Sequence, residues 1–328
     1  MRFSDQREWL MPPLGLTIIL TVVSLLLVPR TQGMTYALGM VPTWLVASFI
    51  IGVITVFGRM VKQKVSSPLA EFRRFWNEEY VRIIGTLAIV MLAGANKVAF
   101  MWTKALLNYL VPFWADPMLA RIDSLLFFGH DPWRLLSALP LEGMGLFYHP
   151  VWYMMLVTMV TLTAWARPSV QRSALLLSYF MLWSLAGPLI HILLPAGGPI
   201  FYESLGAGAR FADLAPTVET AGVRDYLFHI YSNKEFGAGA GISAMPSLHV
   251  ATAAWTVIAA ATIARRLLVP ISIGAAVIAF LSVALGWHYA LDGIVGALAA
   301  FIAYRGALAW YLRRSHHASS ARPATAAA

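Results

Sequence analysis

The stretch from His249 to Asp292, HVATAAWTVIAAATIARRLLVPISIGAAVIAFLSVALGWHYALD, contains two apolar runs with polar residues at both ends. The pair Arg265–Arg266 separates the two runs. At a helical rise of about 1.5 Å per residue, each run covers most of a bilayer core. The chain therefore crosses the membrane and returns. This hairpin predicts that His249 and His288 reach the same membrane face at adjacent helix ends.

The composition of the whole chain also indicates an integral membrane protein. Of its 328 residues, 59% are hydrophobic and 12% are charged, and the mean hydropathy is +0.69. A soluble domain carries about 25% charged residues. The absence of cysteine excludes disulfides, iron–sulfur clusters and a thiol nucleophile. The net charge of +9 comes from basic residues spread over short loops, which argues against a nucleic-acid partner.

Apolar runs near spanning length predict an all-α, polytopic membrane helix bundle with about eight spans. They occupy residues 12–29, 41–58, 82–102, 145–165, 173–194, 248–265, 270–287 and 290–312. No small-x-small cleavage site follows the first run, so we expect that run to be retained. With the N-terminus inside, the inner segments carry more lysines and arginines than the outer ones. The long loop 195–247, His249 and His288 then lie on the outer face.

Two further stretches do not resemble spans. Residues 67–80, SPLAEFRRFWNEEY, repeat apolar residues at helical spacing and predict a helix on the inner membrane surface, with a solvated connector as the alternative. Acidic residues and prolines in 103–144 predict short outer-face or re-entrant helices. We therefore divide the chain into N-terminal spans with an interfacial helix (1–80), a catalytic membrane domain (81–314) and a disordered tail (315–328).

Polar groups at the ends of apolar runs are costly and indicate a functional site. Asp292 follows His288 by four residues, so the two side chains are neighbours on a helix. A histidine held by a carboxylate through one ring nitrogen exposes the other as a nucleophile or base. A second histidine, His249, can protonate a leaving oxygen. Phosphoryl transfer uses such a pair, and the helix start at Pro246–Ser247 offers backbone N–H groups to phosphate oxygens.

Other interpretations of the same residues remain open. Two histidines and a carboxylate can form a facial triad that binds a metal ion. The hydroxyls of Ser243 and Ser247 suggest a serine hydrolase, although no Gly-x-Ser-x-Gly motif is present. Single histidines in membrane helices are usually contacts between helices, and we assign His149 and His191 to that class.

The histidine motifs resemble those of the type 2 phosphatidic acid phosphatase superfamily. Its Pro-Ser-x-His motif corresponds to Pro246–His249, and its His-x-x-x-Asp motif corresponds to His288–Asp292. Leu248 and the aromatic Tyr289 are more similar to the inositol phosphorylceramide synthase branch, whose members are sensitive to aureobasidin. The stretches PAGGPIFY (195–202) and DSLLFFGHDPW (123–133) also resemble segments of that branch. The resemblance covers roughly residues 115–312.

This resemblance implies a core of six helices and a reaction without metal or organic cofactor. It implies that His288 is the nucleophile that forms a phosphohistidine, that Asp292 orients it, and that His249 is the general acid and later the base. In the synthase branch, phosphoinositol moves from phosphatidylinositol to a ceramide hydroxyl. The substrates implied are a phospholipid donor and a lipid or polyol acceptor.

Two phosphate-binding cations of the superfamily are missing from their usual places. The Lys-x6-Arg-Pro motif is not found, and Ser282 stands where an arginine precedes the nucleophile by six residues. A transition state of this charge still needs cations. We expect Arg210 and Arg224 of the long loop to supply them. Ser247, Tyr202 and Asp123 complete the predicted substrate-binding residues.

Three functions are compatible with these residues. The first is a membrane phosphotransferase, the second a lipid or polyprenyl phosphate phosphatase with water as acceptor, and the third a non-catalytic lipid binder or transporter. An aspartate-braced histidine facing a second histidine favours the enzymes, since a transporter has no need of it. The alanine-rich, cysteine-free composition favours a bacterial inner membrane with a periplasmic site over a lumenal site in the Golgi. The oligomeric state is not predicted.

Overall fold

The structure is a computed structural model that describes residues 7–27, 38–237 and 239–320. These residues are helical with no strand, which confirms the predicted all-α class. The long helices are α1 (Arg7–Leu27), α3 (Met40–Lys62), α4 (Pro68–Leu110), α7 (Met144–Trp165), α11 (Leu248–Ile263), α12 (Leu268–Ala284) and α13 (Ala290–Ser320). The shorter ones are α5 (Asp116–Leu126), α6 (Pro132–Leu136), α8 (Val170–Met181), α9 (Gly187–Leu193) and α10 (Val218–Ser232). A π-helical turn, Leu182–Ala186, joins α8 to α9, and 3-10 turns occupy Pro199–Phe201 and Arg265–Leu267.

Seven helical segments of the described chain are long and apolar enough to cross a membrane, as expected of an integral multi-pass protein. Segment Val170–Leu193, made of α8, the π turn and α9, counts as one. The remaining predicted span, 248–265, corresponds to α11, whose 16 residues are fewer than the roughly 20 that a bilayer requires. The chain that leads into α11 is buried, with Ala244 and Ser247 fully covered. Non-helical backbone is tolerated at membrane depth where protein surrounds it.

Helix α11 lies at the centre of the bundle and packs against α7, α8, α12 and α13. Trp255 of α11 is fully buried, and its indole N–H donates to the carbonyl oxygen of Leu175 at 3.0 Å. A Cβ atom on Gly296 of α13 would lie only 2.5 Å from the carbonyl oxygen of Ser247. Glycine at this position therefore lets α11 and α13 begin side by side, which brings their first residues into one site.

The N-terminal helices belong to the same packed bundle. Helices α1 and α3 both pack against α4. The Ser24 hydroxyl of α1 bonds to Thr103 of α4, and Ser48 of α3 lies 2.8 Å from the Thr161 hydroxyl of α7. Such interhelical hydrogen bonds are a common means of association inside a bilayer. The expected domain boundary at residue 80 falls within α4, so the helix connects the two expected parts.

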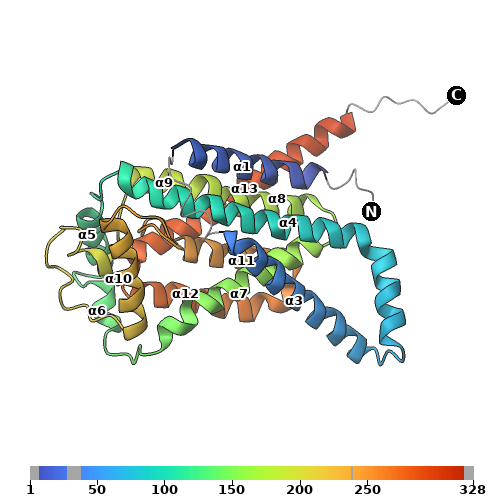
Figure 1. The fold of residues 1–328 in the computed structure, drawn as a ribbon, viewed down its shortest axis with the longest axis horizontal. Helices are drawn as coiled ribbons and strands as arrows, with labels where there is room; N and C mark the ends of the chain where they lie inside the picture. The colour runs from blue at the N-terminus through green and yellow to red at the C-terminus, as the bar shows by residue number, and fades with distance from the viewer. Residues whose placement is uncertain (1–6, 28–37, 238, 321–328) are drawn as a thin grey trace.

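The predicted surface helix at 67–80 and the predicted span at 82–102 form the single helix α4. In Figure 1 the first turns of α4 run across the long axis of the molecule, and the rest run along it. Leu69, Phe72 and Trp76 are exposed on these first turns. An exposed apolar face that turns away from the bundle agrees with an interfacial helix, which stays a prediction.

The C-terminal helix is longer than the sequence indicated. We expected a disordered tail from residue 315, but α13 continues to Ser320. The hydroxyl of Ser315 donates to the carbonyl oxygen of Leu312 at 2.8 Å. Residues 321–328 of the expected tail lie outside the described residues.

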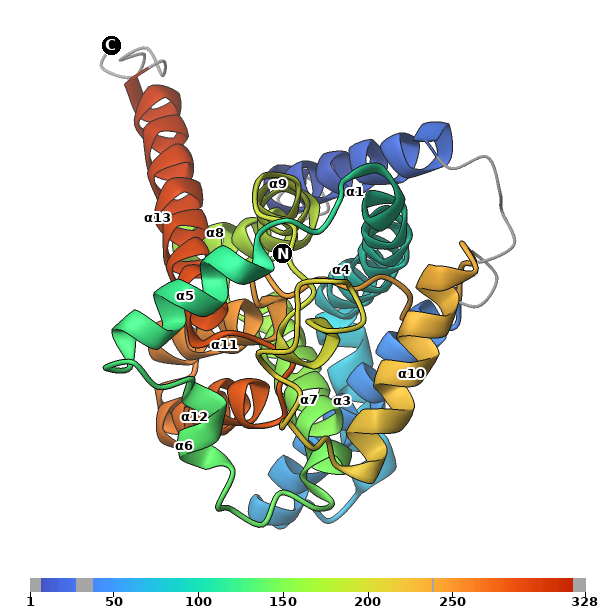
Figure 2. The same cartoon turned by 90° about the vertical axis from the view of Figure 1, so that its left-hand side faces the viewer.

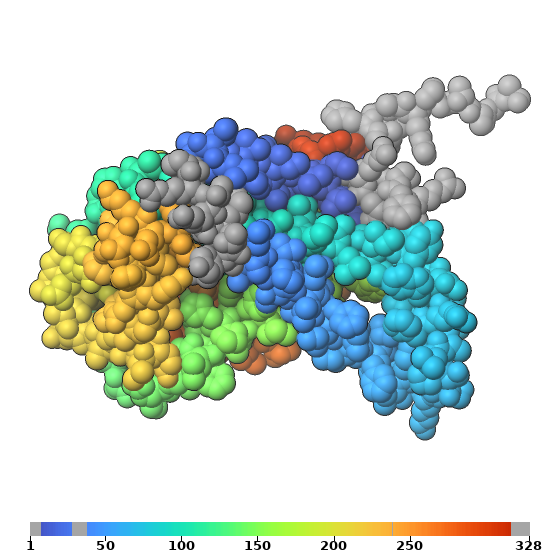
Figure 3. All heavy atoms as spheres, viewed as in Figure 1, coloured from blue at the N-terminus to red at the C-terminus, as the bar shows by residue number. Residues whose placement is uncertain are grey.

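Short helices gather at one end of the bundle. Helices α5, α6 and α10 lie together at the left of Figure 1 and face the viewer in Figure 2. Helices α5 and α6 are the short helices predicted within 103–144, although α4 continues to Leu110 before they begin. The segment between α9 and α11 covers the same end in the space-filling view of Figure 3. This cap of short helices and loops surrounds the starts of α11 and α13.

Candidate active site

The start of α11 places His249. The hydroxyl of Ser247 accepts a hydrogen bond from the backbone N–H of Val250 at 3.3 Å and caps the helix. The backbone N–H of Ser247 donates to the carbonyl oxygen of Asp292 at 3.1 Å. Ser247, predicted to bind substrate, is fully buried and here joins α11 to α13.

His288 is placed by the turn between α12 and α13. Gly286 adopts a φ of 75°, a conformation that favours glycine, and ends α12. The backbone N–H of His288 then donates to the carbonyl oxygen of Ser282 at 3.0 Å. Its ring nitrogen Nδ1 donates to the carbonyl oxygen of Ala244 at 2.9 Å. A carbonyl oxygen can only accept, so Nδ1 carries the proton and Nε2 keeps a free lone pair.

Asp292 lies beside His288 but is not its main hydrogen-bond partner. The Oδ2 atom of Asp292 is 3.5 Å from Nδ1 of His288, and it accepts the backbone N–H of Tyr289 at 2.9 Å. Asp292 is fully buried, and its Oδ1 atom has no hydrogen-bond partner among the described residues. The sequence predicted that this carboxylate braces the ring. Its contact with Nδ1 agrees with that prediction, and the Ala244 carbonyl accepts a closer hydrogen bond from the same nitrogen.

The two histidines predicted to act together do meet. The ring centroids of His249 and His288 are 6.2 Å apart, with an angle of 57° between the ring planes. His288 is buried and His249 is partly buried. This separation places the two imidazoles in one site.

Helix α7 surrounds His249 with residues that the sequence did not assign to the site. The ring centroid of His249 lies 5.1 Å from Tyr148, 5.2 Å from His149 and 4.4 Å from Trp152. The contact of His149 with His249 joins α7 to α11, so His149 is a contact between helices as expected. His191 also contacts another helix, through Asn108 of α4 at 3.3 Å.

Two lysines of α4 also face this cluster. The Nζ atom of buried Lys97 lies 3.1 Å from the ring centroid of Trp183 and 4.8 Å from that of Trp152. Lys104 lies two helical turns further along α4 and is partly buried. Seven residues separate the lysines, which places them on one helix face. Neither forms an ion pair within the described part of the chain.

The two lysines were not assigned to the site from the sequence. Lys97 and Lys104 have the spacing of the Lys-x6-Arg motif that was not found, with lysine in place of arginine and Ala105 in place of proline. Their position at this spacing inside an apolar run is the sequence pattern that could have identified them as site residues. Buried cations without a carboxylate partner are well placed to bind an anion.

Asp123 and Asp116, two turns apart on α5, hold the segments around His288. The carboxylate of Asp123 accepts the backbone N–H groups of Ala290 and Leu291 at 2.8 and 2.9 Å, and so caps α13. Asp116 accepts the N–H groups of Gly197 and Gly198 at 2.8 and 2.9 Å. It also accepts the hydroxyl of Tyr289 at 2.9 Å. Burial raises the pKa of both carboxyls, and these hydrogen bonds oppose the shift.

Asp123 was predicted to bind substrate. In the structure both of its oxygens are already engaged by the helix start. The structure thus gives α5 a positioning role, because its two carboxylates fix the backbone on either side of His288.

The remaining predicted substrate-binding residues are Arg210, Tyr202 and Arg224, and each has its own partners in the structure. Arg210 forms an ion pair with Asp131 at 2.6 Å, which raises the pKa of the guanidinium. Tyr202 is buried, and its ring centroid lies 4.9 Å from that of Phe211. Arg224 pairs with the adjacent Asp225 on α10, and no contact of the described chain joins it to the histidines. Neither arginine is therefore an unpaired cation in the site.

No group of three or more histidine, aspartate or glutamate residues is arranged to hold a metal ion within residues 7–27, 38–237 and 239–320.

Comparison with protein families agrees with the motifs. Residues 118–306 match a family model described as PAP2 superfamily, and the match covers more than half of the chain. The chain belongs to the PAP2 superfamily. Membership indicates an enzyme of the phosphatase or phosphotransferase type that acts on lipids. No curated protein and no solved structure matches the chain. The matched region contains His249, His288 and Asp292, and begins after Lys97 and Lys104.

Proposed function

We propose that this membrane enzyme transfers a phosphate-linked head group, phosphoinositol, from a phospholipid to a lipid hydroxyl such as that of ceramide. The observation that carries the proposal is the placement of His288, whose Nδ1 donates to a carbonyl, which leaves Nε2 available, and whose ring centroid lies 6.2 Å from that of His249. The proposal extends the family assignment to the inositol phosphorylceramide synthase-like branch, which Leu248 and Tyr289 support.

The first step forms a bond between Nε2 of His288 and phosphorus and breaks the bond from phosphorus to the diacylglycerol oxygen. Protonated His249 gives its proton to that oxygen, so diacylglycerol leaves neutral. The proton on Nδ1 of His288 stays on that nitrogen, hydrogen-bonded to the Ala244 carbonyl, and Asp292 compensates the positive charge that develops on the ring. Head group and phosphorus are now attached to His288.

The second step reverses these roles. His249 takes the proton of the acceptor hydroxyl, whose oxygen attacks phosphorus as the bond to Nε2 breaks. His288 is released, and the phosphodiester product carries the head group on the acceptor. Lys97 and Lys104 lie on the His249 side of the site and are suited to stabilise the extra negative charge on the phosphate oxygens in both steps.

Hydrolysis by the same site is the second candidate, since the family includes phosphatase-type chemistry. Water would then replace the acceptor hydroxyl in the second step. The two candidates differ in product. With phosphatidylinositol and ceramide, transfer yields a phosphodiester lipid, whereas hydrolysis yields a water-soluble inositol phosphate or, from a lipid phosphate monoester, inorganic phosphate.

A trapping experiment tests the mechanism. Purified full-length protein is incubated with phosphatidylinositol labelled in the inositol ring, without acceptor, and is then quenched in alkali. We expect acid-labile label on the wild-type protein and none on His288→Ala. Label that persists on His288→Ala at the wild-type level would remove the proposal. Mass spectrometry of the lipids formed after addition of ceramide or water distinguishes transfer from hydrolysis.

We further propose that the site faces the periplasm of a bacterial inner membrane. The distribution of lysine and arginine along the chain supports this orientation.

A further inference from the structure

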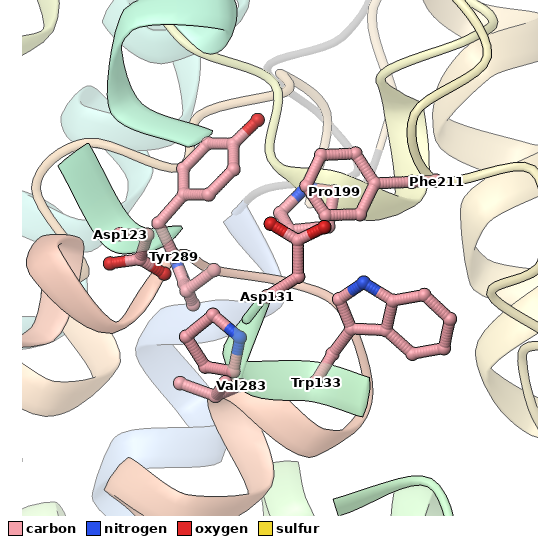
Figure 4. A pocket seen from close by; sticks show the side chains of 9 residues that line it. Asp123, Asp131, Trp133, Pro199, Phe211, Val283 and Tyr289 are labelled. Atoms are coloured by element: carbon pink, nitrogen blue, oxygen red, sulfur yellow. The ribbon is translucent and has the colours of Figure 1, made fainter. Parts of the chain in front are cut away.

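The cap of short helices has one side that packs on the active site and one side that does not. Helix α5 packs against α13, and α6 packs against α12. Figure 4 shows Asp123 of α5 and Trp133 of α6 beside Tyr289, around a small cavity next to His288. Residues 125–129, where α5 ends and turns toward α6, do not line this cavity. We call these five residues the α5 tip.

The α5 tip is apolar and exposed. Phe128 is 95% exposed, Leu125 is 71% exposed and Leu126 is 49% exposed. Single exposed leucines are common on protein surfaces, whereas adjacent large apolar side chains mark a binding surface. Phe128 also has a φ of 54°, which is uncommon for a bulky residue. Packing against the rest of the described chain does not account for a phenylalanine at this position.

The exposed face of α5 continues the surface of the tip. Met118, Arg121 and Leu125 follow one another at spacings of three and four residues, so they lie on one face of the helix, and all three are exposed. The opposite face carries the buried residues of α5, which are Asp116, Leu119, Ala120 and Asp123. Helix α5 is therefore amphipathic, with a second apolar face that the protein leaves uncovered.

The one charge on this exposed face is suited to a lipid surface. Arg121 forms no ion pair within the part of the chain that the structure describes. An arginine can lay its aliphatic stem along apolar surface while its guanidinium reaches polar surroundings. Helices that lie in a membrane interface combine such basic residues with leucine and phenylalanine, and their charges are attracted to lipid phosphates.

The α5 tip lies at the level where the spanning helices meet the surface of the bilayer. Asp123, one turn before the tip, accepts the backbone N–H groups that begin α13, at 2.8 and 2.9 Å. Helix α13 is one of the candidate spans, and its Ile294 and Leu298 are exposed in the turns that follow. Figure 2 shows the end of α5 extending sideways past α12. Lipid that surrounds α12 and α13 therefore lies next to the tip.

We propose that the α5 tip is a membrane anchor that inserts Leu125, Leu126 and Phe128 into the leaflet around the outer ends of α12 and α13. Phospholipid offers acyl chains to these side chains and phosphate groups to Arg121. The apolar sides of α12 and α13 continue into the tip, which favours lipid over a second copy of this chain as the partner. This inference does not depend on the proposed function.

The anchor also has a consequence for the active site. Asp116 and Asp123 of the same helix hold the backbone on either side of His288. A helix that is seated in the leaflet at one end and bonded to these segments along its length fixes the depth of His288 relative to the lipid head groups.

The test measures the surroundings of residue 128 by fluorescence. Phe128→Cys gives this cysteine-free chain a single thiol, to which an environment-sensitive fluorophore is attached. The labelled full-length protein is placed in phosphatidylcholine bilayer discs, whose two faces are both open to solvent. Phe301→Cys, at an exposed phenylalanine of the spanning part of α13, is the matched control for lipid. Ser204→Cys, at an exposed residue of the loop that covers the capped end in Figure 3, is the control for water.

Three quenchers are compared: a lipid with a nitroxide near its head group, a lipid with a nitroxide at its chain end, and iodide in solution. At residue 128 we expect the first to quench about twofold or more strongly than the second, because an interfacial segment enters only about 5–10 Å into the boundary between head groups and chains. At Phe301→Cys the lipid with the chain-end nitroxide should be the stronger of the two. At Ser204→Cys iodide alone should quench.

Two results would overturn the anchor. Quenching of the residue-128 label by iodide to the extent seen at Ser204→Cys would show that the tip lies in water. Protection from iodide and from both nitroxide lipids would show that protein covers the tip, as in a dimer of this chain. Leu125→Cys repeats the measurement at a second position of the tip, so that the result does not depend on one variant.

Discussion

Replacing Lys97 with methionine should lower activity and raise stability at the same time. Lys97 is 8% exposed and forms no ion pair within the described residues. Its ammonium group is 3.1 Å from the ring centroid of Trp183. Methionine has a similar length and flexibility, so the substitution removes the charge with little change in packing.

The expected magnitudes follow from this environment. Loss of one preorganised group that stabilises transition-state charge typically lowers kcat by about 10²- to 10³-fold. Burial of an ammonium costs several kcal/mol, whereas a desolvated cation–π contact returns about 2 kcal/mol. We therefore expect Lys97→Met to gain about 1–2 kcal/mol of stability, or roughly 2–8 °C in unfolding temperature.

The assay measures both quantities on the same preparation. Initial rates of head-group transfer give kcat and KM, and a thermal unfolding scan in detergent at fixed rate gives the apparent unfolding temperature. Lys62→Met, at an exposed lysine that ends α3, is the control and should change neither. A Lys97→Met protein that unfolds at lower temperature, or that retains a third or more of wild-type kcat, would refute a phosphate-binding role for this lysine.

Further predictions concern protonation, positioning and orientation. Single-turnover rates should show a bell-shaped pH dependence between about pH 5 and 8, because the attacking His288 must be neutral while His249 must carry a proton. A flat profile would exclude acid–base catalysis by His249. Burial raises the pKa of Asp116 and of Asp123, so the folded protein binds these protons more tightly than the unfolded chain. Their contribution to stability should therefore be present at low pH and be lost as pH rises through the raised pKa values, and changing both to asparagine should flatten that part of a plot of unfolding temperature against pH. Asp123→Ala should cost about 1–3 kcal/mol of stability and lower kcat more than it raises KM, because two backbone N–H groups beside His288 lose their acceptor. Asp123→Asn should restore part of the stability and part of kcat. Equal effects of the alanine and asparagine substitutions would argue against a capping role. Single cysteines introduced into this cysteine-free chain test the orientation of the protein in the membrane. A membrane-impermeant maleimide applied to intact cells should label Ser232→Cys, at the end of α10, and spare Ser66→Cys, between α3 and α4. The opposite labelling pattern would place the site on the cytosolic side.

Local sequence was sufficient for the parts of the site that depend on one hairpin. Two apolar runs of near-spanning length bring their ends together, so His249 and His288 had to approach each other. The spacing of four residues from His288 to Asp292 also predicted that the two side chains are neighbours, and they are, although His288 lies in the turn before α13 rather than on the helix. The approach of the two hairpin ends depends on helix geometry alone.

Local sequence could not report the partners that tertiary packing supplies. Asp123 was predicted to bind substrate, and the structure adds that it caps α13, whose start is distant in the chain. Arg210 was predicted to bind phosphate, and the structure adds its ion pair with Asp131. In both cases the partner comes from a segment whose position is set by the packing of many helices, and no periodicity in the sequence reports it.

The sequence by itself determined that this chain is a multi-pass helical membrane protein, and that two histidines and an aspartate lie at one end of a hairpin. Hydrophobic length and helical spacing are local properties, so they survive in any arrangement of the helices. Only the tertiary structure decided that the Ala244 carbonyl leaves Nε2 of His288 free, and that α4 brings Lys97 to the site. Those outcomes depend on which helix faces meet in the packed bundle, because a side chain's partner is supplied by distant segments rather than by its neighbours in sequence.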